Sequence, residues 1–426
     1  MKLNQLNELS ADRPLLTPEI HQPNDFYGHA AILKKYAGFF PDYKVKAVIE
    51  HAPRLGADPW KPDLEALLPA IFVSAPYRFH FFRKFTKRDL YAIGPMISYT
   101  IGLLNHEEIE SEKRRLGKNL LVFPAHSTHR VSVNFDTPKF CEHIELIGKD
   151  FDSVRICLYW KDVLRGWAEE YLKYGFECVT AGHMFDPLFL ARLKSIIETA
   201  TLTVSNDFGT HIGYSVILNK PHYYIPENVE ISVENDRIFK ADGCGFRQMS
   251  EIEEVKTAFA GFRSDISSKQ REIVDKYWGV TSHKSVKELR ELFEITDKMF
   301  EQGHYQEISR LNSYKPFINF DLIKSLMTKK NRKFAIFGAG MCGQSILSIL
   351  QNLNQVYNYS NVMEFFLDND PQKHHSCIMG KTVLKPQTDI IEEVDFIVVS
   401  SIWKDDIENQ LLDMGVPEEK IIFGVN

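Results

Sequence analysis

Short apolar runs alternate with amphipathic stretches along most of the chain, and this alternation predicts an α/β fold. Between residue 25 and about residue 115, runs rich in β-branched and aromatic residues predict strands, namely "KVKAVIEH", "AIFVSAP" and "DLYAIG". Stretches such as "FYGHAAILKKYAGFF" carry apolar residues at helical spacing. The charged pattern "EEIESEKRRLGKN" then predicts a solvated helix and a linker to a second block.

From residue 119 to about residue 240 the alternation is more regular. Apolar runs predict strands at "NLLVFPAH", "SVRICLYW", "FECVTAGH", "ATLTVSN" and "PHYYI". The stretches "DVLRGWAEEYLKYG" and "DPLFLARLKSIIETA" predict helices, and Gly175 ends the first of them. Nearly continuous apolar strands separated by helices are typical of a parallel sheet that is covered on both faces.

From about 250 to 328 no strand pattern is present, and the apolar spacing predicts helices. From residue 332 onward, strands and helices alternate again. The sequence therefore predicts an α/β protein with two Rossmann-like lobes, a helical connector and a third, C-terminal Rossmann-like domain. The expected boundaries are 1–115, 116–245, 246–330 and 331–426.

Composition and charge narrow the classes of function. The chain is 44% hydrophobic and 25% charged, which is normal for a globular protein, and its net charge of −6 excludes a general attraction to nucleic acid. Six scattered cysteines form no CxxC pair, so no zinc site is expected. The start of the sequence lacks the apolar region of a signal peptide, and no apolar run approaches the about 20 residues of a membrane helix. We expect a cytoplasmic protein, with docking on the inner face of the membrane left open.

Polar residues follow three of the predicted strands in the second block. They are His126, Ser127, Thr128 and His129 after the first strand, Gly182 and His183 after the third, and Ser205, Asn206, Gly209, Thr210 and His211 after the fourth. In an open parallel sheet, ligands bind outside the carboxyl ends of the strands. Hydroxyl and backbone N–H groups at a helix start can hold a phosphate there. Small polar residues at such junctions are also ordinary helix caps, but three junctions that each carry a histidine favour a functional crevice.

The stretch from "LLVFPAHSTH" through "SNDFGTHIGYSVILNKPHYYI" resembles the donor-binding lobe of bacterial GT-B glycosyltransferases, most of all those of capsule, lipopolysaccharide and teichoic-acid assembly. In that lobe a strand ends in a small polar loop, and a helix, an Asn-Lys-Pro turn and another strand follow. The resemblance implies that the loop binds the phosphates of a sugar nucleotide, with residues 116–245 as the donor lobe. The long Arg/Lys pair of many such enzymes is absent, which leaves a CMP- or CDP-linked donor open.

The resemblance makes residues 1–115 the acceptor lobe, which would supply a base to the acceptor hydroxyl. Asp25 and His29 stand four residues apart and are expected on one helical face, and His51 ends the predicted strand "KVKAVIEH". A solvated helix start with Asp25 as its cap is the alternative. In the donor lobe, His126, His183 or His211 would stabilise the charge of the leaving group.

The third block carries strand, G-x-G-x-x-G and helix in "KFAIFGAGMCGQS", with Gly338, Gly340 and Gly343. Asp368 ends the next predicted strand, where a dinucleotide-binding fold places the acid that reaches a ribose hydroxyl. The block resembles small Rossmann-like domains found beside bacterial sugar-modifying enzymes and methyltransferases. The sequence leaves open whether it binds NAD(P), another nucleotide or a nucleotide sugar, or serves in assembly.

The sequence thus predicts a metal-independent GT-B-like glycosyltransferase of polysaccharide biosynthesis, which needs no cofactor for transfer. Its partners would be a nucleotide-sugar donor and a glycan or lipid-linked acceptor, without nucleic acid; self-association is left open. Three alternatives remain: a polyol-phosphate transferase of the teichoic-acid type, an NAD-dependent sugar oxidoreductase, and a nucleotide-sugar-binding protein.

Overall fold

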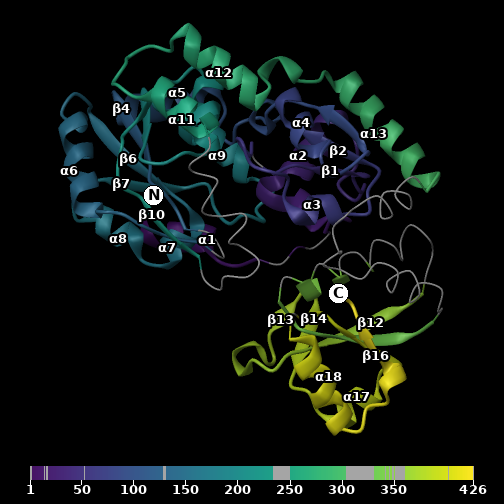
Figure 1. Ribbon diagram of the computed structural model, residues 1–426. Helices are drawn as coiled ribbons and strands as arrows, with labels where there is room; N and C mark the ends of the chain where they lie inside the picture. The colour runs from purple at the N-terminus through teal and green to yellow at the C-terminus, as the bar shows by residue number, and fades with distance from the viewer. Residues whose placement is uncertain are drawn as a thin grey trace.

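The computed structural model describes residues 2–13, 15, 18–51, 53–127, 131–233, 250–303, 331–340, 342–344, 346–347, 350, 360–401 and 403–425, and it leaves out the side chains of 131–132 and 231–233. Two parallel sheets and one mixed sheet, each flanked by helices, dominate these residues, as Figure 1 shows, and a small antiparallel pair is separate from them. The predicted α/β class, with two Rossmann-like lobes, a helical segment and a third Rossmann-like domain, is confirmed. Among the residues described, no helix combines the length and apolarity needed to cross a membrane.

The first lobe is built on a three-stranded parallel sheet in the order β1-β2-β3. Its strands are β1 (Ala47–Ile49), β2 (Ala70–Val73) and β3 (Asp89–Ala92). The first two are buried along their whole length, as their continuous apolar sequence predicts. The helices of this lobe are η1 (Gln22–Gly28), α2 (His29–Ala37), α3 (Lys61–Glu65), η2 (Pro76–Arg78), α4 (Phe79–Phe82) and η3 (Met96–Tyr99).

The second lobe holds a five-stranded parallel sheet in the order β7-β6-β4-β8-β9. Its strands are β4 (Asn119–Phe123), β6 (Ser153–Leu158), β7 (Glu177–Thr180), β8 (Leu202–Ser205) and β9 (His222–Tyr224). The helices are α5 (His106–Leu116), α6 (Thr137–Gly148), α7 (Trp160–Leu164), α8 (Trp167–Leu172), α9 (Phe189–Glu198) and α10 (Thr210–Ile217). A separate antiparallel pair joins β5 (Val131–Asn134) to β10 (Glu230–Val233), which the apolar pattern did not predict.

The expectation of one helix through "DVLRGWAEEYLKYG" is wrong, because two short helices, α7 and α8, occupy this stretch. Gly166 lies between them with φ of 82°. That left-handed conformation ends one helix and caps the next, and glycine adopts it without the steric cost of a side chain.

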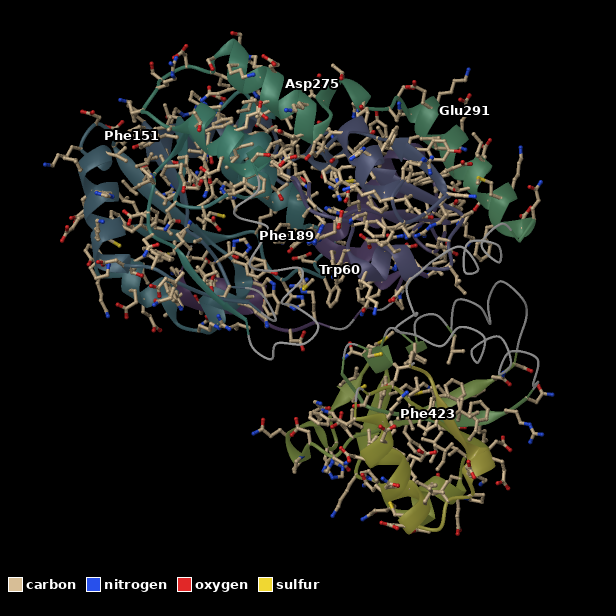
Figure 2. All side chains as sticks on the ribbon, viewed as in Figure 1. Trp60, Phe151, Phe189, Asp275, Glu291 and Phe423 are labelled. Atoms are coloured by element: carbon tan, nitrogen blue, oxygen red, sulfur yellow. The ribbon has the colours of Figure 1, made fainter. Side chains whose placement is uncertain are left out.

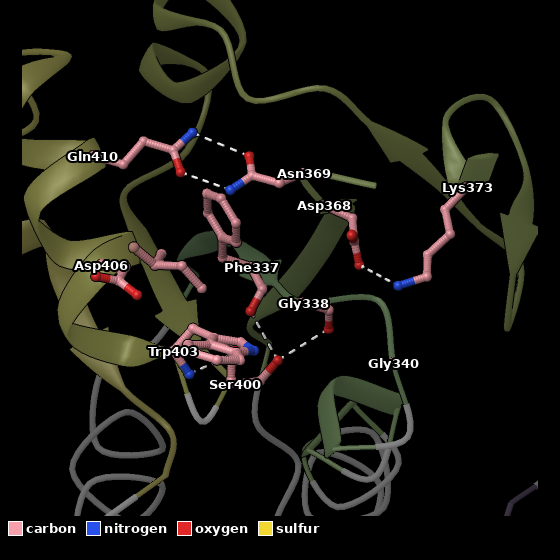
Figure 3. A pocket seen from close by; sticks show the side chains of 12 residues that line it. Phe337, Gly338, Gly340, Asp368, Asn369, Lys373, Ser400, Trp403, Asp406 and Gln410 are labelled. Carbon is pink, nitrogen blue, oxygen red and sulfur yellow. Dashed lines mark hydrogen bonds and ion pairs between the residues drawn. The ribbon is translucent and has the colours of Figure 1, made fainter. Parts of the chain in front are cut away.

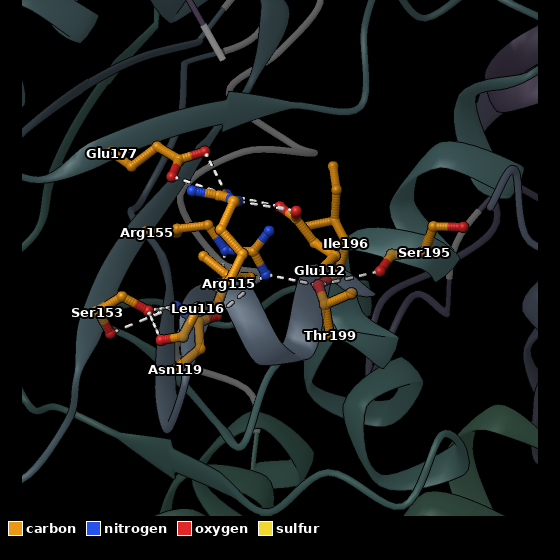
Figure 4. A network of polar contacts seen from close by, with 10 residues as sticks. All are labelled: Glu112, Arg115, Leu116, Asn119, Ser153, Arg155, Glu177, Ser195, Ile196 and Thr199. Atoms are coloured by element: carbon orange, nitrogen blue, oxygen red, sulfur yellow. Dashed lines mark hydrogen bonds and ion pairs between the residues drawn. The ribbon is translucent and has the colours of Figure 1, made fainter. Parts of the chain in front are cut away.

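The amino end of the second sheet is held by a buried polar network around Arg155 (Figure 4). The guanidinium donates to the side-chain oxygen of Asn119 at 3.0 and 3.1 Å and to the hydroxyl of Thr199 at 2.7 Å. Asn119 in turn donates to the hydroxyl of Ser153 at 2.8 Å. This end of the sheet is thus closed by groups that satisfy one another, which leaves the carboxyl end for ligands.

Three helices return the chain from the second lobe to the first, namely α11 (Ser250–Phe259), α12 (Ser268–Trp278) and α13 (Val286–Glu301). Helix α12 packs on α10, and α13 packs on α2 (Figure 1). In α13, Phe293 stacks on Phe72 of the first sheet, with 6.0 Å between ring centroids. The same hydrophobic cluster reaches Leu121 of the second sheet and Trp278. The two lobes therefore share one core.

The N-terminal segment also touches both lobes. Helix α1 (Leu3–Ser10) packs on α7 and β7 of the second lobe, where Leu6 is fully buried. The segment then reaches the first lobe, where Glu19 is buried against Lys34. It thus ties the two lobes together independently of the helices that follow the second sheet.

The C-terminal domain has a six-stranded sheet in the order β13-β14-β12-β11-β15-β16. Its strands are β11 (Lys333–Phe337), β12 (Val362–Leu367), β13 (Cys377–Ile378), β14 (Lys381–Leu384), β15 (Phe396–Val399) and β16 (Ile421–Phe423). All pairings are parallel except that of β13 with β14. The strands are connected by helices α17 (Thr388–Glu392) and α18 (Lys404–Asp413) and by the 3-10 turns η6 (Pro371–Lys373) and η7 (Glu418–Lys420). Outside this domain, the short turn η5 (Val280–Ser282) precedes α13.

Candidate functional site

The two lobes meet at the carboxyl ends of their strands. There the backbone N–H of Tyr27 donates to the carbonyl of Met184 at 2.6 Å, and the hydroxyl of Tyr27 lies 3.4 Å from that of Tyr159. Phe189 packs on Tyr27 with ring centroids 4.7 Å apart, and Trp60 lies nearby at the same boundary (Figure 2). We call the side chains gathered at this boundary the interlobe cluster. Its members are Tyr27, His29, His51, His126 and Tyr159, which are linked by ring contacts and the tyrosine pair, and His211, which is joined to them through its electrostatic interaction with His126.

The backbone before α2 decides which side chains of the first lobe join the cluster. Tyr27 and Gly28 both have positive φ, 56° and 75°. This reversal starts α2 at His29 and leaves Asp25 in the preceding turn. The expectation that Asp25 and His29 share one helical face is therefore wrong. The reversal also brings Gly28 against the second lobe, where an added Cβ would lie 2.5 Å from the carbonyl oxygen of Pro187.

His29 and His51 face the cluster as neutral imidazoles. The ring of His51 stacks on Tyr27 at 5.3 Å between centroids, and His29 lies 5.9 Å from the same ring. Burial lowers the pKa of His51 to about 4, and burial together with His51 lowers the pKa of His29 to about 3. At neutral pH both rings can accept a proton or donate a hydrogen bond, but neither carries positive charge.

Asp25 belongs to a different group of side chains. Its carboxylate accepts the backbone N–H of Glu19 at 2.8 Å, and Lys34 donates to Glu19 at 2.6 Å. Burial, followed by the neighbouring Glu19 carboxylate, raises the pKa of Asp25 to about 8. Asp25 is thus mostly protonated at neutral pH, a state in which it cannot accept a proton from an acceptor hydroxyl.

On the second lobe, His126 follows β4 and packs on Tyr159 at 4.6 Å between ring centroids. His211, in the first turn of α10, stacks on Phe123 at 4.7 Å with an interplanar angle of 14°. Burial, then the neighbouring His222 and His126, hold the pKa of His211 well below its usual range. The Nε2 atom of His211 is buried and meets no hydrogen-bond partner among the described residues. A buried polar atom left in this way indicates a ligand or water contact.

Ser205 and Asn206 form the framework behind α10. Ser205 is fully buried; its hydroxyl donates to the carbonyl of Asp207 at 3.0 Å and lies 3.0 Å from Nε2 of His222. Asn206 accepts the backbone N–H of Ala125 at 2.7 Å, which joins the loop after β8 to the loop after β4. The Nδ2 atom of Asn206 is buried without a partner in the part of the chain that is described.

Of the other residues predicted to contact the donor, Gly209 and Thr210 lie at the start of α10, and Ser127 follows β4. Gly209 precedes α10 with extended backbone, and Thr210 is the first residue of the helix. The hydroxyl of Ser127 is buried and accepts the backbone N–H of Val133 at 3.1 Å. Thr128 and His129 were also predicted to contact the donor, and they lie outside the described residues.

Gly182 and His183 hold the end of β7 against the N-terminal segment. Nδ1 of His183 accepts the backbone N–H of Phe185 at 3.1 Å, and its Nε2 lies 3.4 Å from the carboxylate of Asp12. The ring packs on Trp160 at 4.1 Å between centroids. A Cβ at Gly182 would lie 3.2 Å from the carbonyl oxygen of Leu9. This pair therefore borders the interlobe cluster and has its ring nitrogens engaged by protein groups.

Three side chains at this site, Tyr27, Tyr159 and Asp162, were not among the residues predicted from the sequence. Tyr159 bridges His126 and Tyr27, and Asp162 is buried beneath the loop after β4. Burial raises the pKa of Asp162 to about 6, although the backbone N–H and hydroxyl of Ser127 donate to the carboxylate. The sequence signal was the strand end "CLYWKD", where an aromatic residue and an acid follow an apolar run.

The C-terminal domain has its own pocket, of about 420 Å³, at the carboxyl ends of β11, β12 and β15 (Figure 3). The predicted glycines Gly338 and Gly340 and the predicted acid Asp368 line it. Gly343 lies behind the turn, where an added Cβ would come within 1.9 Å of the carbonyl oxygen of Gly338. Within the described residues, no group of three or more His, Cys, Asp or Glu side chains could hold a metal ion.

A protein-family profile described as C2185-like, N-terminal, matches residues 330–422, which is the C-terminal domain. No curated protein sequence matches the chain.

Solved structures show partial likeness at low identity. The RSP protein in complex with β-NADH is 19% identical, with a TM-score of 0.19 over 33% of this chain and 74% of that one. UDP-GlcNAc 2-epimerase from Methanocaldococcus jannaschii is 13% identical, with a TM-score of 0.33 over 59% and 70%. The E. coli ADP-heptose lipopolysaccharide heptosyltransferase II is 12% identical, with a TM-score of 0.22 over 49% and 82%. Likeness at this level carries no conclusion about activity.

Proposed function

We propose that the two lobes form a glycosyltransferase that moves a sugar from a nucleotide-activated donor, CMP- or CDP-linked, to a surface glycan. The observation that carries this proposal is the pairing of Tyr27 and Tyr159 across the lobes, with His51 stacked on one ring and His126 on the other. Ligand sites of α/β proteins lie at such carboxyl-end boundaries. The resemblance of residues 205–225 to GT-B donor lobes points the same way.

The donor phosphates would lie at the start of α10. The backbone N–H groups of the first helical turn have no partner within a helix, and they favour an anion. Thr210 adds a hydroxyl, and the buried, unpartnered nitrogens of Asn206 and His211 add two further contacts at the same place. The sugar would then extend toward the first lobe.

The acceptor hydroxyl would be activated by the first lobe. His51 and His29 are the candidate bases there, because burial keeps both imidazoles neutral and therefore able to accept a proton. In the transfer, the hydroxyl proton passes to the imidazole and the acceptor oxygen forms a bond to the anomeric carbon. The bond from that carbon to the phosphate oxygen breaks, and the nucleotide leaves with the electron pair.

The test is nucleotide release from CMP-, CDP-, UDP- and GDP-linked sugars by the intact chain, with and without glycan acceptors. His211→Ala and His51→Ala are each expected to lower turnover about 100-fold or more, the lower end of the effect of losing one group that assists proton or charge transfer. His143→Ala is the matched control, because His143 lies on α6 and contacts Glu227 at 2.7 Å away from the interlobe cluster.

The released product separates the alternatives. A glycosyltransferase releases CDP from a CDP-linked donor, whereas a polyol-phosphate transferase attacks at phosphorus and releases CMP. An oxidoreductase would reduce NAD⁺ in the presence of a sugar. If no donor is turned over, or if both histidine variants retain full activity, the interlobe cluster is not the site of transfer.

A further inference from the structure

The C-terminal pocket has features that the proposed transfer reaction does not use. We infer that it binds a nucleoside diphosphate or a conjugate of one, with the phosphates on the glycine turn and the base against Trp403, rather than a dinucleotide held through Asp368. This inference does not rest on the proposed function, because it concerns a different sheet and a different set of side chains.

The glycine turn leaves room for phosphate on one side only. Behind the turn, Gly343 approaches Gly338 so closely that a Cβ would lie 1.9 Å from the carbonyl oxygen. Gly340 lines the pocket, and a Cβ there would meet no atom of the described residues within 4 Å. A turn that is packed tightly against its helix and open in front allows the backbone to approach a phosphate group.

Asp368 is already engaged by protein donors. One carboxylate oxygen accepts the backbone N–H of Ala339 at 2.8 Å and the ammonium of Lys373 at 3.0 Å, and the other accepts the N–H of Asp370 at 2.9 Å. These donors hold the pKa of Asp368 below its usual range, against the effect of burial. In a dinucleotide-binding fold this acid accepts the ribose hydroxyls. Here it fastens the glycine turn to the loop after β12.

A second contact crosses the same side of the pocket. The side-chain amides of Asn369 and Gln410 exchange two hydrogen bonds, at 2.7 and 3.1 Å, between the end of β12 and helix α18 (Figure 3). This pair borders the pocket beside Asp368. We take the part lined by Gly340 and the residues that follow β15 as its open part.

Trp403 lines that open part and leaves 62% of its surface exposed. It precedes the first turn of α18, beside Ser400, whose hydroxyl donates to the carbonyls of Phe337 and Gly338 at 2.8 and 3.0 Å. Exposed aromatic rings at the edge of a pocket provide a stacking surface for a nucleobase, and such stacking tolerates any base. One nucleotide can span the turn and the indole ring.

The experiment is calorimetric titration of the full chain with UDP, CDP, ADP, GDP and NAD⁺, each against the same set of variants. Trp403→Ala is expected to lower the affinity for whichever nucleoside diphosphate binds by about 5- to 150-fold, the range measured for removing one stacking ring. Trp403→Phe, which keeps an aromatic ring, is expected to retain most of the affinity. Gly340→Val should abolish this binding. His211→Ala should leave it unchanged, which separates this pocket from the interlobe cluster.

Three results would overturn the inference. The first is that Trp403→Ala weakens the binding of none of the nucleoside diphosphates. The second is that Gly340→Val retains the affinity of the wild type. The third is that NAD⁺ binds more tightly than every nucleoside diphosphate and that Asp368→Asn loses this affinity. The melting temperature of each variant, measured in parallel, shows whether a loss of binding comes from unfolding.

Discussion

The hydroxyl oxygens of Tyr27 and Tyr159 lie 3.4 Å apart, although the two residues belong to different lobes and are separated by 132 positions in the sequence. This distance is at the outer limit of a hydrogen bond. Burial raises the pKa of both phenols, so both remain neutral hydroxyls at physiological pH. The pair marks the point at which a ligand between the lobes would contact both.

We predict that Tyr159→Phe lowers turnover about 2- to 12-fold, which corresponds to the loss of one neutral hydrogen bond of about 0.5–1.5 kcal/mol. The melting temperature should change little, because the ring remains in place. Steady-state nucleotide release measures the effect, and the control is Tyr174→Phe, because Tyr174 follows α8 and its ring stacks on Phe176. Unchanged turnover in Tyr159→Phe would mean that the Tyr27–Tyr159 pair takes no part in the reaction.

Ser205 and Thr210 should respond differently to alanine. Ser205→Ala removes the contacts to Asp207 and His222 inside the second lobe and should lower the free energy of unfolding by about 1–3 kcal/mol. Thr210→Ala should instead weaken donor binding and leave stability nearly unchanged. Denaturant unfolding and donor titration of both variants give the two quantities. If Thr210→Ala destabilises and does not affect affinity, its hydroxyl is only part of the helix start.

Asp25→Asn is expected to stabilise the protein increasingly as pH rises from 5 to 8. The folded protein keeps a proton on Asp25 up to about pH 8, whereas the unfolded chain releases it near 3.8. Stability from this group is therefore complete below the unfolded pKa and is lost as pH rises, at up to about 1.4 kcal/mol per pH unit. Urea unfolding at several pH values tests this, with the exposed Asp58→Asn as control. Parallel pH profiles for wild type and Asp25→Asn would contradict the shift.

Donor binding should be coupled to uptake of up to one proton by His211. Burial and the neighbouring histidines keep this ring neutral when the site is empty, and a bound phosphate would raise its pKa. Affinity should therefore increase as pH falls toward 6. Titration calorimetry in buffers of different ionisation enthalpy measures the uptake, which His211→Ala should remove. Identical binding enthalpies in all buffers would mean that no proton is taken up.

Gly340 and Gly343, two glycines of the turn after β11, should respond differently to alanine. Gly343→Ala should destabilise this domain by roughly 1–3 kcal/mol, because its Cβ would collide with the carbonyl oxygen of Gly338. Gly340→Ala should leave stability unchanged, since the space beside it is open. Thermal unfolding followed in the C-terminal domain distinguishes them. Equal melting temperatures for the two variants would show that the turn can widen.

The arrangement of strands could be predicted because nearly all of them are continuous apolar runs between clear turns. Strands β13, β14 and β16 and the antiparallel β5–β10 pair were not predicted. The apolar run of β16 is only three residues long, and polar residues interrupt the runs of β5, β10 and β14. The split between α7 and α8 depends on the conformation of Gly166, which helical periodicity does not reveal.

His51, His126 and His211 could be located because each follows a strand end, whereas His29 was chosen by its spacing from Asp25. Their protonation could not be predicted, since the low pKa of His211 comes from burial by residues distant in sequence. Asp25 was grouped with His29 by spacing alone, but the positive φ of Tyr27 separates them. The role of Ser205 within the protein depends on His222, which joins it only when β8 and β9 pair.

Helix α1 packs against α7 and β7, and this has a consequence for synthesis on the ribosome. The helix ends at Ser10 and β7 ends at Thr180, so about 170 residues must be added before the docking surface of α1 exists. At typical elongation rates of about 5–20 residues per second, this takes roughly 8 to 34 s. During that time the apolar side chain of Leu6 lacks the native surface that buries it in the folded protein.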